Sequence, residues 1–286
     1  MAITIGSNIT SLKAQRQLTK STAGLSATYS RLSSGLRINK ASDDAAGLAI
    51  ADSLKADQRV AAVAIRNAND GISTIAIADG ALSQVSDVLT RLAELAEQSA
   101  NGVYSTSQRN ALQNEFSALG SEIQRIATTT EFNGVKLLDG AGSGITLQVG
   151  FDSKETSRIS ITNVAGTLQR LGIGNADGDM TISISGETIE EGQAASRDAL
   201  DKVNLAIGSL ASTRGNLGAV ESRLSVTINN LEVAKENFAS AESQIRDVDV
   251  ASEAAELTRL NILQQAGASV LAQANQQPAI ALSLLA

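Results

Sequence analysis

The sequence VNLAIGSLASTRGNLGAVESRLSVTINNLEVAKENFASAESQI, residues 203–245, carries an apolar residue at every seventh position. These positions are Val203, Leu210, Leu217, Leu224, Leu231, Phe238 and Ile245. A second row, three residues further on, consists of small or apolar residues from Ala206 to Val248. Two such rows are the a and d seam by which one long helix packs along another. At about 1.5 Å per residue, the seam predicts a helix of roughly 63 Å.

An apolar row of the same period and length lies nearer the start of the chain. It contains Leu54, Ala61, Ala68, Ile75, Leu82, Leu89 and Ala96. The matched lengths favour two long helices in an elongated rod over two helices of a compact core. The residues predicted to form the assembly seam are Leu54, Ile75, Leu82, Leu89, Leu210, Leu217, Leu224, Leu231, Phe238 and Ile245.

The composition narrows the chemistry that the chain can perform. Of its 286 residues 43% are hydrophobic but only 2% are aromatic, so helices must pack through Ala, Leu, Ile and Val. Cys and His are both absent, which excludes disulfides, thiolate and imidazole catalysis and nearly every transition-metal site. We therefore expect no enzyme activity and no cofactor. A carboxylate-based hydrolase displayed on a filament remains as an alternative, although no paired acids fall in one loop.

Charge is distributed unevenly along the chain. Residues 1–42 carry six bases and no acid, and residues 260–286 carry no charge. The net charge of −7 argues against a nucleic-acid partner, which would require a basic face. The N-terminus lacks the features of a cleaved signal peptide, and no run of eighteen apolar residues occurs. These observations predict neither a cleaved signal nor membrane insertion.

Breaks in the apolar pattern divide the chain into five segments. We expect an N-terminal arm at 1–42, a long helix and a third helix at 43–130, a β-hairpin- and turn-rich insertion at 131–189, a C-terminal long helix at 190–246 and a C-terminal arm at 247–286. The predicted fold is mainly α: an elongated bundle of long antiparallel helices with coiled-coil seams and a small β insertion.

Local signals place the ends of these elements. Gly35 is expected to end the first helix and Ser42 to cap the second, which continues through Asn69-Asp70-Gly71 because its apolar phase is unbroken. Ser105–Ser107 offer caps for the third helix, and Thr188 with Glu191 forms a capping box for the last long one. Within the insertion, three alternating runs predict strands: ITLQVGF, SRISIT and MTISIS.

The two arms each carry one apolar stripe and little else to bury. We expect them to pack through Leu18, Leu25, Leu32, Leu260, Leu263, Val270 and Leu271. A helix with a single stripe gains nothing from burial when it is alone. The arms are therefore predicted to be disordered in the free subunit and to fold on assembly.

Four short motifs resemble ligand or modification sites and are better explained otherwise. The stretch Asn175–Asp179 lacks the Gly and Glu that a calcium loop requires at its sixth and twelfth positions. Gly140–Gly144 leads into a strand without a following Lys, unlike a phosphate loop. The sequon at Asn8-Ile-Thr10 falls on a helical arm, and Asp43-Asp44 suits a helix start better than a catalytic pair.

Several blocks of the sequence form a recognisable pattern at the two ends of the chain: Arg31-Leu-Ser-Ser-Gly-Leu-Arg-Ile-Asn39, Asp43-Asp-Ala-Ala-Gly-Leu-Ala-Ile50, Gly80-Ala-Leu82, Gln98-Ser-Ala-Asn101, Glu131-Phe-Asn-Gly134, Ala241-Glu-Ser243, Ile245-Arg-Asp247 and Val270-Leu-Ala-Gln-Ala-Asn-Gln276. Together these blocks resemble bacterial flagellin. The resemblance covers roughly residues 1–140 and 190–286. It implies a short flagellin with little or no outer domain, in which the arms pair as coiled coils lining a central channel and the long helices form an outer tube.

The resemblance also implies partners and a location. The subunit would be exported unfolded by flagellar type III secretion, with a cytosolic chaperone bound to its C-terminal arm. It would join copies of itself under the filament cap, beside the junction proteins. The resulting extracellular filament would be used for motility. A host Toll-like receptor would contact Arg91, Glu94, Leu95, Gln98 and Glu115, whereas Thr90, Ala93 and Glu97 depart from the recognised pattern. The alternatives are a hook–filament junction protein and a filament-displayed adhesin or binding module.

Overall fold

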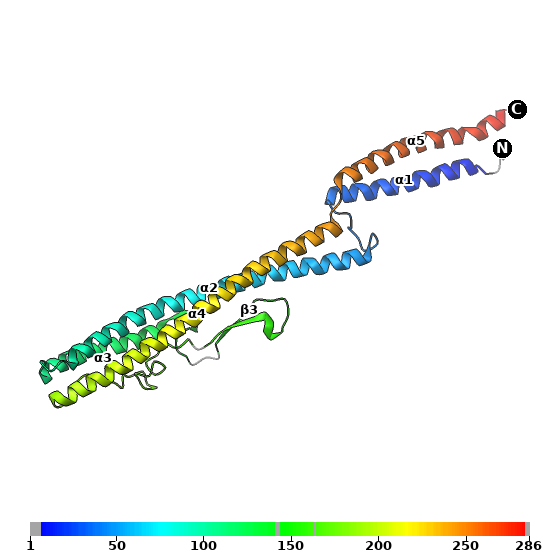
Figure 1. Ribbon diagram of the computed structural model, residues 1–286. Coiled ribbons are helices and arrows are strands. Elements are labelled where there is room, and N and C mark those ends of the chain that lie inside the picture. The colour runs from blue at the N-terminus through cyan, green and yellow to red at the C-terminus, as the bar shows by residue number, and fades with distance from the viewer. Residues whose placement is uncertain (1–6, 141–143, 163, 284–286) are drawn as a thin grey trace. The chain divides into compact units, whose positions relative to one another are not determined.

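The computed structural model describes residues 7–140, 144–162 and 164–283 (Figure 1). The helices are α1 (Ile9–Ser34), α2 (Ala45–Ala100), α3 (Thr106–Thr129), α4 (Ile189–Arg246) and α5 (Val250–Ser283). The short strands are β1 (Glu131–Phe132), β2 (Val135–Lys136), β3 (Ile145–Gln148) and β4 (Arg158–Ile161), with a 3-10 turn, η1, at Glu155–Ser157. The prediction of a mainly α fold with a small β insertion is confirmed.

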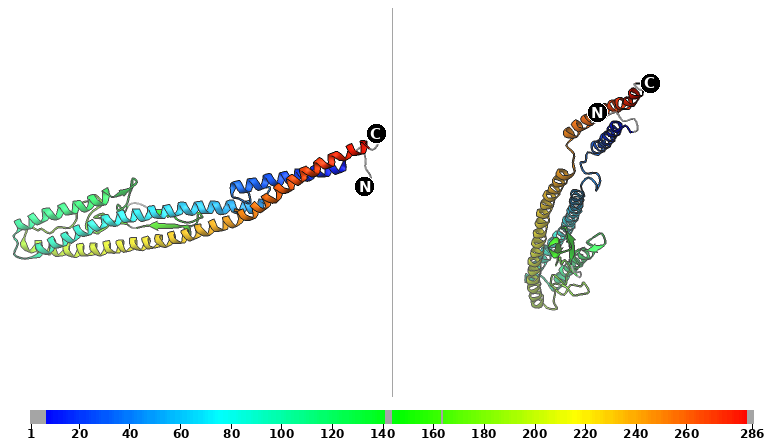
Figure 2. Two further views of the ribbon diagram at one scale, coloured as in Figure 1. Left: turned by 90° about the horizontal axis from the view of Figure 1, so that it is seen from above. Right: turned by 90° about the vertical axis from the view of Figure 1, so that its right-hand side faces the viewer.

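The chain divides into two compact units. Unit 1 consists of Met1–Gln58 and Glu236–Ala286, and unit 2 of Arg59–Lys235. Unit 1 therefore contains α1, α5 and one end each of α2 and α4. Within it, α1 and α5 lie side by side along their length (Figures 1 and 2).

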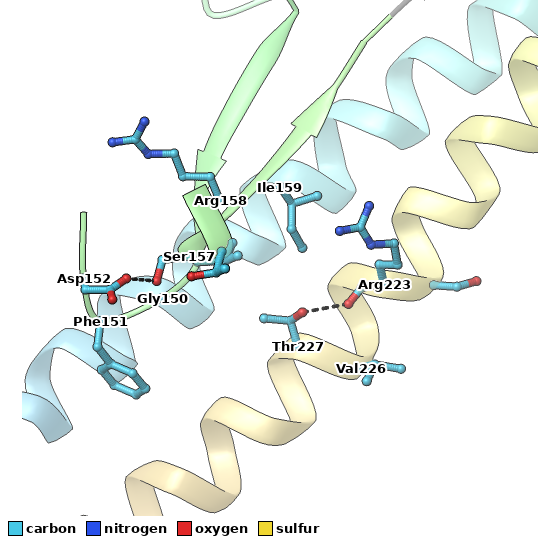
Figure 3. A pocket seen from close by; sticks show the side chains of 12 residues that line it. Gly150, Phe151, Asp152, Ser157, Arg158, Ile159, Arg223, Val226 and Thr227 are labelled. Atoms are coloured by element: carbon cyan, nitrogen blue, oxygen red, sulfur yellow. Dashed lines mark hydrogen bonds between the residues drawn. The ribbon is translucent and has the colours of Figure 1, made fainter. Parts of the chain in front are cut away.

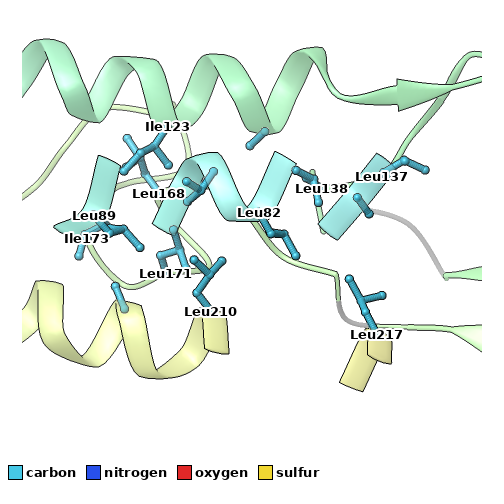
Figure 4. Packing of buried hydrophobic residues seen from close by; sticks show 14 of the residues in the cluster. Leu82, Leu89, Ile123, Leu137, Leu138, Leu168, Leu171, Ile173, Leu210 and Leu217 are labelled. Atoms are coloured by element: carbon cyan, nitrogen blue, oxygen red, sulfur yellow. The ribbon is translucent and has the colours of Figure 1, made fainter. Parts of the chain in front are cut away.

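Unit 2 holds one continuous hydrophobic core. Residues of α2, α3 and α4 pack with the loops that follow the second hairpin, and Leu82, Leu89 and Ile123 meet Leu168 and Leu210 there (Figure 4). Antiparallel pairing joins β1 to β2 and β3 to β4, so both hairpins connect neighbouring segments of the chain. The core is rich in Leu, Ile and Ala because only small and aliphatic side chains are available in this sequence.

The predicted seam residues differ in burial between the units. Seven of them, all in unit 2, are at most 5% exposed: Ile75, Leu82, Leu89, Leu210, Leu217, Leu224 and Leu231. Leu54, Phe238 and Ile245, in unit 1, are half-buried. Burial of the seven-residue row is therefore complete where α3 and the hairpins add further cover.

Helix caps follow the sequence signals with one correction. Ser105, one of the predicted cap candidates, caps α3 and forms a capping box with Gln108. Thr188 and Glu191 form the predicted capping box on α4. Gly35, at φ 71°, ends α1. The prediction that Ser42 caps α2 is wrong: the Gly47 N–H donates to Asp44 Oδ1 at 2.9 Å. Asp44 immediately precedes the first helical residue, so its carboxylate is the one within reach.

The run MTISIS, 180–185, is not a strand, contrary to the prediction. Beyond the isolated bridge of Met180 to Gly174, side chains rather than a partner strand satisfy its backbone. Gln113 Oε1 accepts from the Ile184 N–H at 2.7 Å, and the Ile184 carbonyl accepts from Ser99 Oγ at 2.7 Å. Ile182 and Ile184 are buried against the helices, which accounts for the alternating pattern without a sheet.

Gly71 lies inside α2, so the Asn69-Asp70-Gly71 sequence does not interrupt the helix. A Cβ at this glycine would collide with Leu147 of β3. The second hairpin thus approaches α2 at the position where the helix has no side chain. Residues 141–143 of the glycine-rich stretch Gly140–Gly144 lie outside the described residues.

Candidate assembly surface

The two terminal helices form an antiparallel pair, which we call the arm pair (α1 with α5). At one end the Asn8 side chain donates to the Ala274 carbonyl at 2.7 Å, and Leu18 lies against Gly267. Further along, Leu260 lies against Gly24. Glycine at both contacts lets the helix backbones approach closely around the leucines.

The interior of the arm pair is small and partly polar. Ser21 and Thr28 are buried, together with Leu260 and Ala274. Gln264 also donates to the Thr22 hydroxyl at 3.5 Å. A seam filled by so few large apolar groups contributes less burial energy than a leucine-lined one.

The predicted arm-packing residues do not all face inward. Leu18, Leu25, Leu32 and Leu271 are half-buried, and Leu260 is buried. Leu263 and Val270, however, are 38% and 58% exposed. Large apolar residues that remain exposed on the arm pair are Ile9, Leu12, Tyr29, Val250, Ile262, Leu263 and Val270. The pair therefore presents apolar surface outward as well as inward.

Backbone hydrogen bonds fasten the base of the arm pair. The Arg37 N–H donates to the Arg246 carbonyl at 2.6 Å, and the Val248 N–H donates to the Gly35 carbonyl at 3.0 Å. Nearby, the backbone N–H groups of Lys40 and Asn39 both donate to Asp43, which lowers the pKa of its carboxyl. The ionised Asp43 carboxylate thus accepts two backbone hydrogen bonds, which order this turn.

The five predicted receptor contacts divide into one buried residue and four exposed ones. Arg91 pairs with Glu94 at 2.8 Å and with Glu115 on α3 at 2.8 Å. The hydrogen bonds that the Arg91 guanidinium donates to Glu94 and Glu115 raise the pKa of Arg91. Gln98 Nε2 donates to the Tyr104 hydroxyl at 3.0 Å. Leu95 is 0% exposed and belongs to the core, so only the four polar side chains are accessible.

An open groove of about 610 Å³ lies between the second hairpin and α4 in unit 2 (Figure 3). Phe151, Arg158, Arg223 and Val226 contribute to its walls. Asp152 is held by Ser157, and the pKa of the Asp152 carboxyl is lowered mainly by that hydrogen bond. Thr227 donates to the Arg223 carbonyl within α4. Asp152 is the one carboxylate among the residues that line the groove.

Comparison with known proteins identifies the family. The pattern of the bacterial flagellin N-terminal helical region matches residues 5–143, and that of the C-terminal helical region matches residues 200–285. The chain is 44% identical over 255 residues to the flagellin of Halalkalibacterium halodurans, covering 89% of each chain. The chain belongs to the bacterial flagellin family. It is also similar to the flagellin of Bacillus subtilis, at 39% identity across 98% of this chain and 99% of that one.

As a flagellin, the protein is a structural subunit of the extracellular flagellar filament. A solved structure of a putative flagellar hook-associated protein from Vibrio parahaemolyticus shares the fold, with a TM-score of 0.57 over 72% of this chain and all of that one. The identity in that comparison is 13%, so it speaks for the fold alone. Among the residues that the structure describes, no helix of this flagellin is long and apolar enough for a membrane span.

Sequence reasoning missed one buried polar site in this flagellin. Arg109 is 0% exposed, and its guanidinium donates to the carbonyls of Ser99, Asn101 and Tyr104 at the end of α2. A cation there satisfies carbonyls that the helix leaves free and complements the negative helix end. Nothing in the local sequence distinguishes Arg109 from a surface arginine, because its acceptors are backbone carbonyls at the end of α2 and in the connection that follows, and only the fold brings them to the guanidinium.

Proposed function

We propose that this flagellin assembles with copies of itself by burying the outward apolar surface of the arm pair. The observation that carries the proposal is the exposure of Leu12, Ile262 and Val270, at 57%, 61% and 58%. Exposed apolar patches of this kind mark interaction surfaces. Each apolar Å² removed from water between neighbours contributes about 25 cal/mol, and repetition along a filament multiplies the gain.

Ordering the arms costs on the order of 1–2 kcal/mol per residue in backbone entropy. The arm pair in one subunit offsets little of that cost, because Ser21 and Thr28 occupy much of its interior. Contacts with neighbours supply the remainder. We therefore keep the prediction that both arms are disordered in the free subunit and fold on assembly.

Electron microscopy of the purified protein tests this proposal. The full chain should form long tubes from a single component, whereas chain trimmed with trypsin to about residues 41–246 should remain monomeric and folded. The trimmed chain is the matched control, since it keeps unit 2 intact. Tubes formed equally well by trimmed protein would refute a role for the arms.

Export and motility belong to the same proposal. A subunit whose arms are loosely held suits export in an unfolded state through the flagellar type III apparatus, followed by insertion beneath the cap and above the junction proteins. The uncharged part of the C-terminal arm, residues 260–286, offers a cytosolic chaperone an apolar sequence before export. Retention of the protein inside cells after deletion of residues 260–286 would support this route, and normal export would oppose it.

We also propose that Arg91, Glu94, Gln98 and Glu115 form the contact surface for a host Toll-like receptor. The supporting observation is that the Arg91–Glu115 pair joins α2 to α3 on an exposed face, with side chains 48% and 45% exposed. Arg91→Ala and Glu115→Ala should each weaken binding of the receptor ectodomain to monomeric flagellin. Glu122→Ala, at a side chain that is 40% exposed, is the control on the same helix as Glu115. Equal binding by all variants would remove this surface from consideration.

A further inference from the structure

Unit 1 separates its charges along the arm pair. At the free end, α1 carries three bases, Lys13, Arg16 and Lys20, all exposed. In the part of the chain that the structure describes, none of the three forms an ion pair. The reason lies in the sequence, since α5 has no charged residue after Arg259 and α1 has no acid at all.

The three bases also repel one another. Lys13 and Arg16 are three residues apart and Arg16 and Lys20 are four apart, so all three share one side of α1. Like charges at these spacings destabilise a helix by a few tenths of a kcal/mol per pair. The free subunit thus keeps an unfavourable cluster that an acidic neighbour would relieve.

The opposite end of unit 1 is acidic. Residues 31–58 and 236–259 together hold ten acids and six bases. Some of these acids already pair, as Glu253 does with Arg31 at 3.7 Å and Glu256 with Arg259. Asp247 and Asp249 remain exposed, and they bond only to neighbouring hydroxyl or backbone groups. The arm pair therefore has basic residues at its free end and acidic residues at its other end.

We infer that Lys13, Arg16 and Lys20 of one subunit dock against the acidic segment 247–256 of the next subunit in a head-to-tail contact. This inference rests on the proposed self-assembly and specifies which surfaces meet. A head-to-tail contact leaves one basic and one acidic end free, so it propagates into a filament. Along α1, the distance from Arg16 to the level of Arg31 and Glu253 is about 22 Å. Neighbouring arm pairs should be offset along their axes by about that distance.

Seeded elongation measures the contact directly. Sonicated wild-type filaments serve as seeds, and turbidity with electron microscopy gives the elongation rate of added subunits. The variant Lys13→Glu/Arg16→Glu/Lys20→Glu should elongate at least tenfold more slowly at low salt, because charge complementarity steers association by about 10–10³-fold. Wild-type elongation should slow as salt approaches about 0.15 M, where the Debye length falls to ~8 Å.

Two further variants separate a specific contact from a general charge effect. Adding Asp247→Lys and Glu256→Lys to the triple variant reverses both surfaces and should restore elongation. Arg66→Glu/Arg197→Glu/Lys235→Glu changes the net charge equally, at exposed bases outside the arms, and should elongate like wild type. Circular dichroism checks that each variant keeps its helices.

The outcomes are distinguishable. If the wild-type chain forms no filament, the proposed function itself fails. Three results would make the docking inference wrong, while the function stands, provided that wild type elongates. The triple arm variant could elongate as fast as wild type, the restoring variant could stay slow, or the control variant could be as slow as the arm variant. Closed dimers from the wild type, or binding of the three bases to anionic phospholipid vesicles with no effect on elongation, would likewise overturn it.

Discussion

The arm pair and the core of unit 2 are built from the same aliphatic residues but use them differently. In unit 2, Leu82, Leu89 and Leu224 are 0% exposed, and the core extends over three helices and two hairpins. In the arm pair, Ile262 and Val270 face outward while Ser21 and Thr28 face inward. Unit 2 therefore buries the apolar residues of its seam within one chain, whereas the arm pair leaves large apolar residues exposed.

The largest expected effect comes from placing the same residue in each region. Leu224→Asp puts an unpaired charge into the unit 2 core, which should lower the free energy of unfolding by about 3–5 kcal/mol. Ile262→Asp, on the exposed side of α5, should change stability by less than about 0.5 kcal/mol and abolish filaments. Urea unfolding and electron microscopy measure the two effects.

Val226→Asp is the control within α4, since Val226 is 60% exposed and lies two residues from the buried Leu224. It should unfold like wild type. If Leu224→Asp also melts like wild type, the seven-residue row is not a buried seam. If Ile262→Asp still polymerises, the outward surface of the arms is not an interface.

The second prediction concerns two arginines in unit 2. Arg109→Met should lower the free energy of unfolding by about 2–4 kcal/mol, because the buried Ser99 carbonyl and the part-buried carbonyls of Asn101 and Tyr104 lose their donor at about 1–3 kcal/mol each, partly offset by removal of a buried charge. Arg91→Met breaks only exposed ion pairs and should cost less than about 1 kcal/mol. Denaturant midpoints compare them. Equal losses would mean that water replaces the Arg109 guanidinium at the end of α2.

The third prediction uses two helical glycines. A Cβ at Gly215 of α4 meets no atom within 4 Å, whereas one at Gly120 of α3 would collide with the end of the Met180 side chain. Gly215→Ala should raise the free energy of unfolding by about 0.5–1 kcal/mol. Gly120→Ala should lower it by about 1 kcal/mol, as core overpacking does. Thermal unfolding of both variants provides the comparison, and a gain at Gly120 would show that Met180 moves aside freely.

The sequence predicted those parts of the fold whose interacting residues lie close together along the chain. The seven-residue period predicted both long helices, because the pattern that makes a helix amphipathic lies within the helix. The cap at Ser105 and the capping box at Thr188 were predicted for the same reason. The run at 180–185 was misjudged, because its backbone partners, Gln113 and Ser99, are far away in sequence.

The candidate site was less predictable than the fold. Apolar residues of the arms could be recognised, but which of them face inward depends on the register between α1 and α5, and Leu263 and Val270 face outward. The family resemblance pointed to Leu95 as a receptor contact, whereas its burial depends on packing among three helices. Nothing in the sequence predicted the burial of Arg109, since only the folded chain brings the end of α2 to it.

The smallest expected effect is electrostatic and lies between the two long helices of unit 2. Asp79 of α2 accepts from Arg214 of α4 at 2.7 Å, and that hydrogen bond lowers the pKa of Asp79 below its ordinary value of 3.8. A carboxyl whose pKa is lower in the folded chain stabilises the fold above its unfolded pKa and loses that contribution as pH falls through the folded one. Because the two side chains are 41% and 37% exposed, solvent screens the pair. Its contribution should remain below about 1 kcal/mol.

Asp79→Asn should therefore unfold slightly more easily than wild type at pH 6, and the difference should shrink below about pH 4 as Asp79 becomes protonated. Urea midpoints of both chains at several pH values measure this. A difference that stays constant down to low pH would show that Asp79 acts through packing or hydrogen bonding of its neutral form, and the ion pair would then contribute nothing to the contact between α2 and α4.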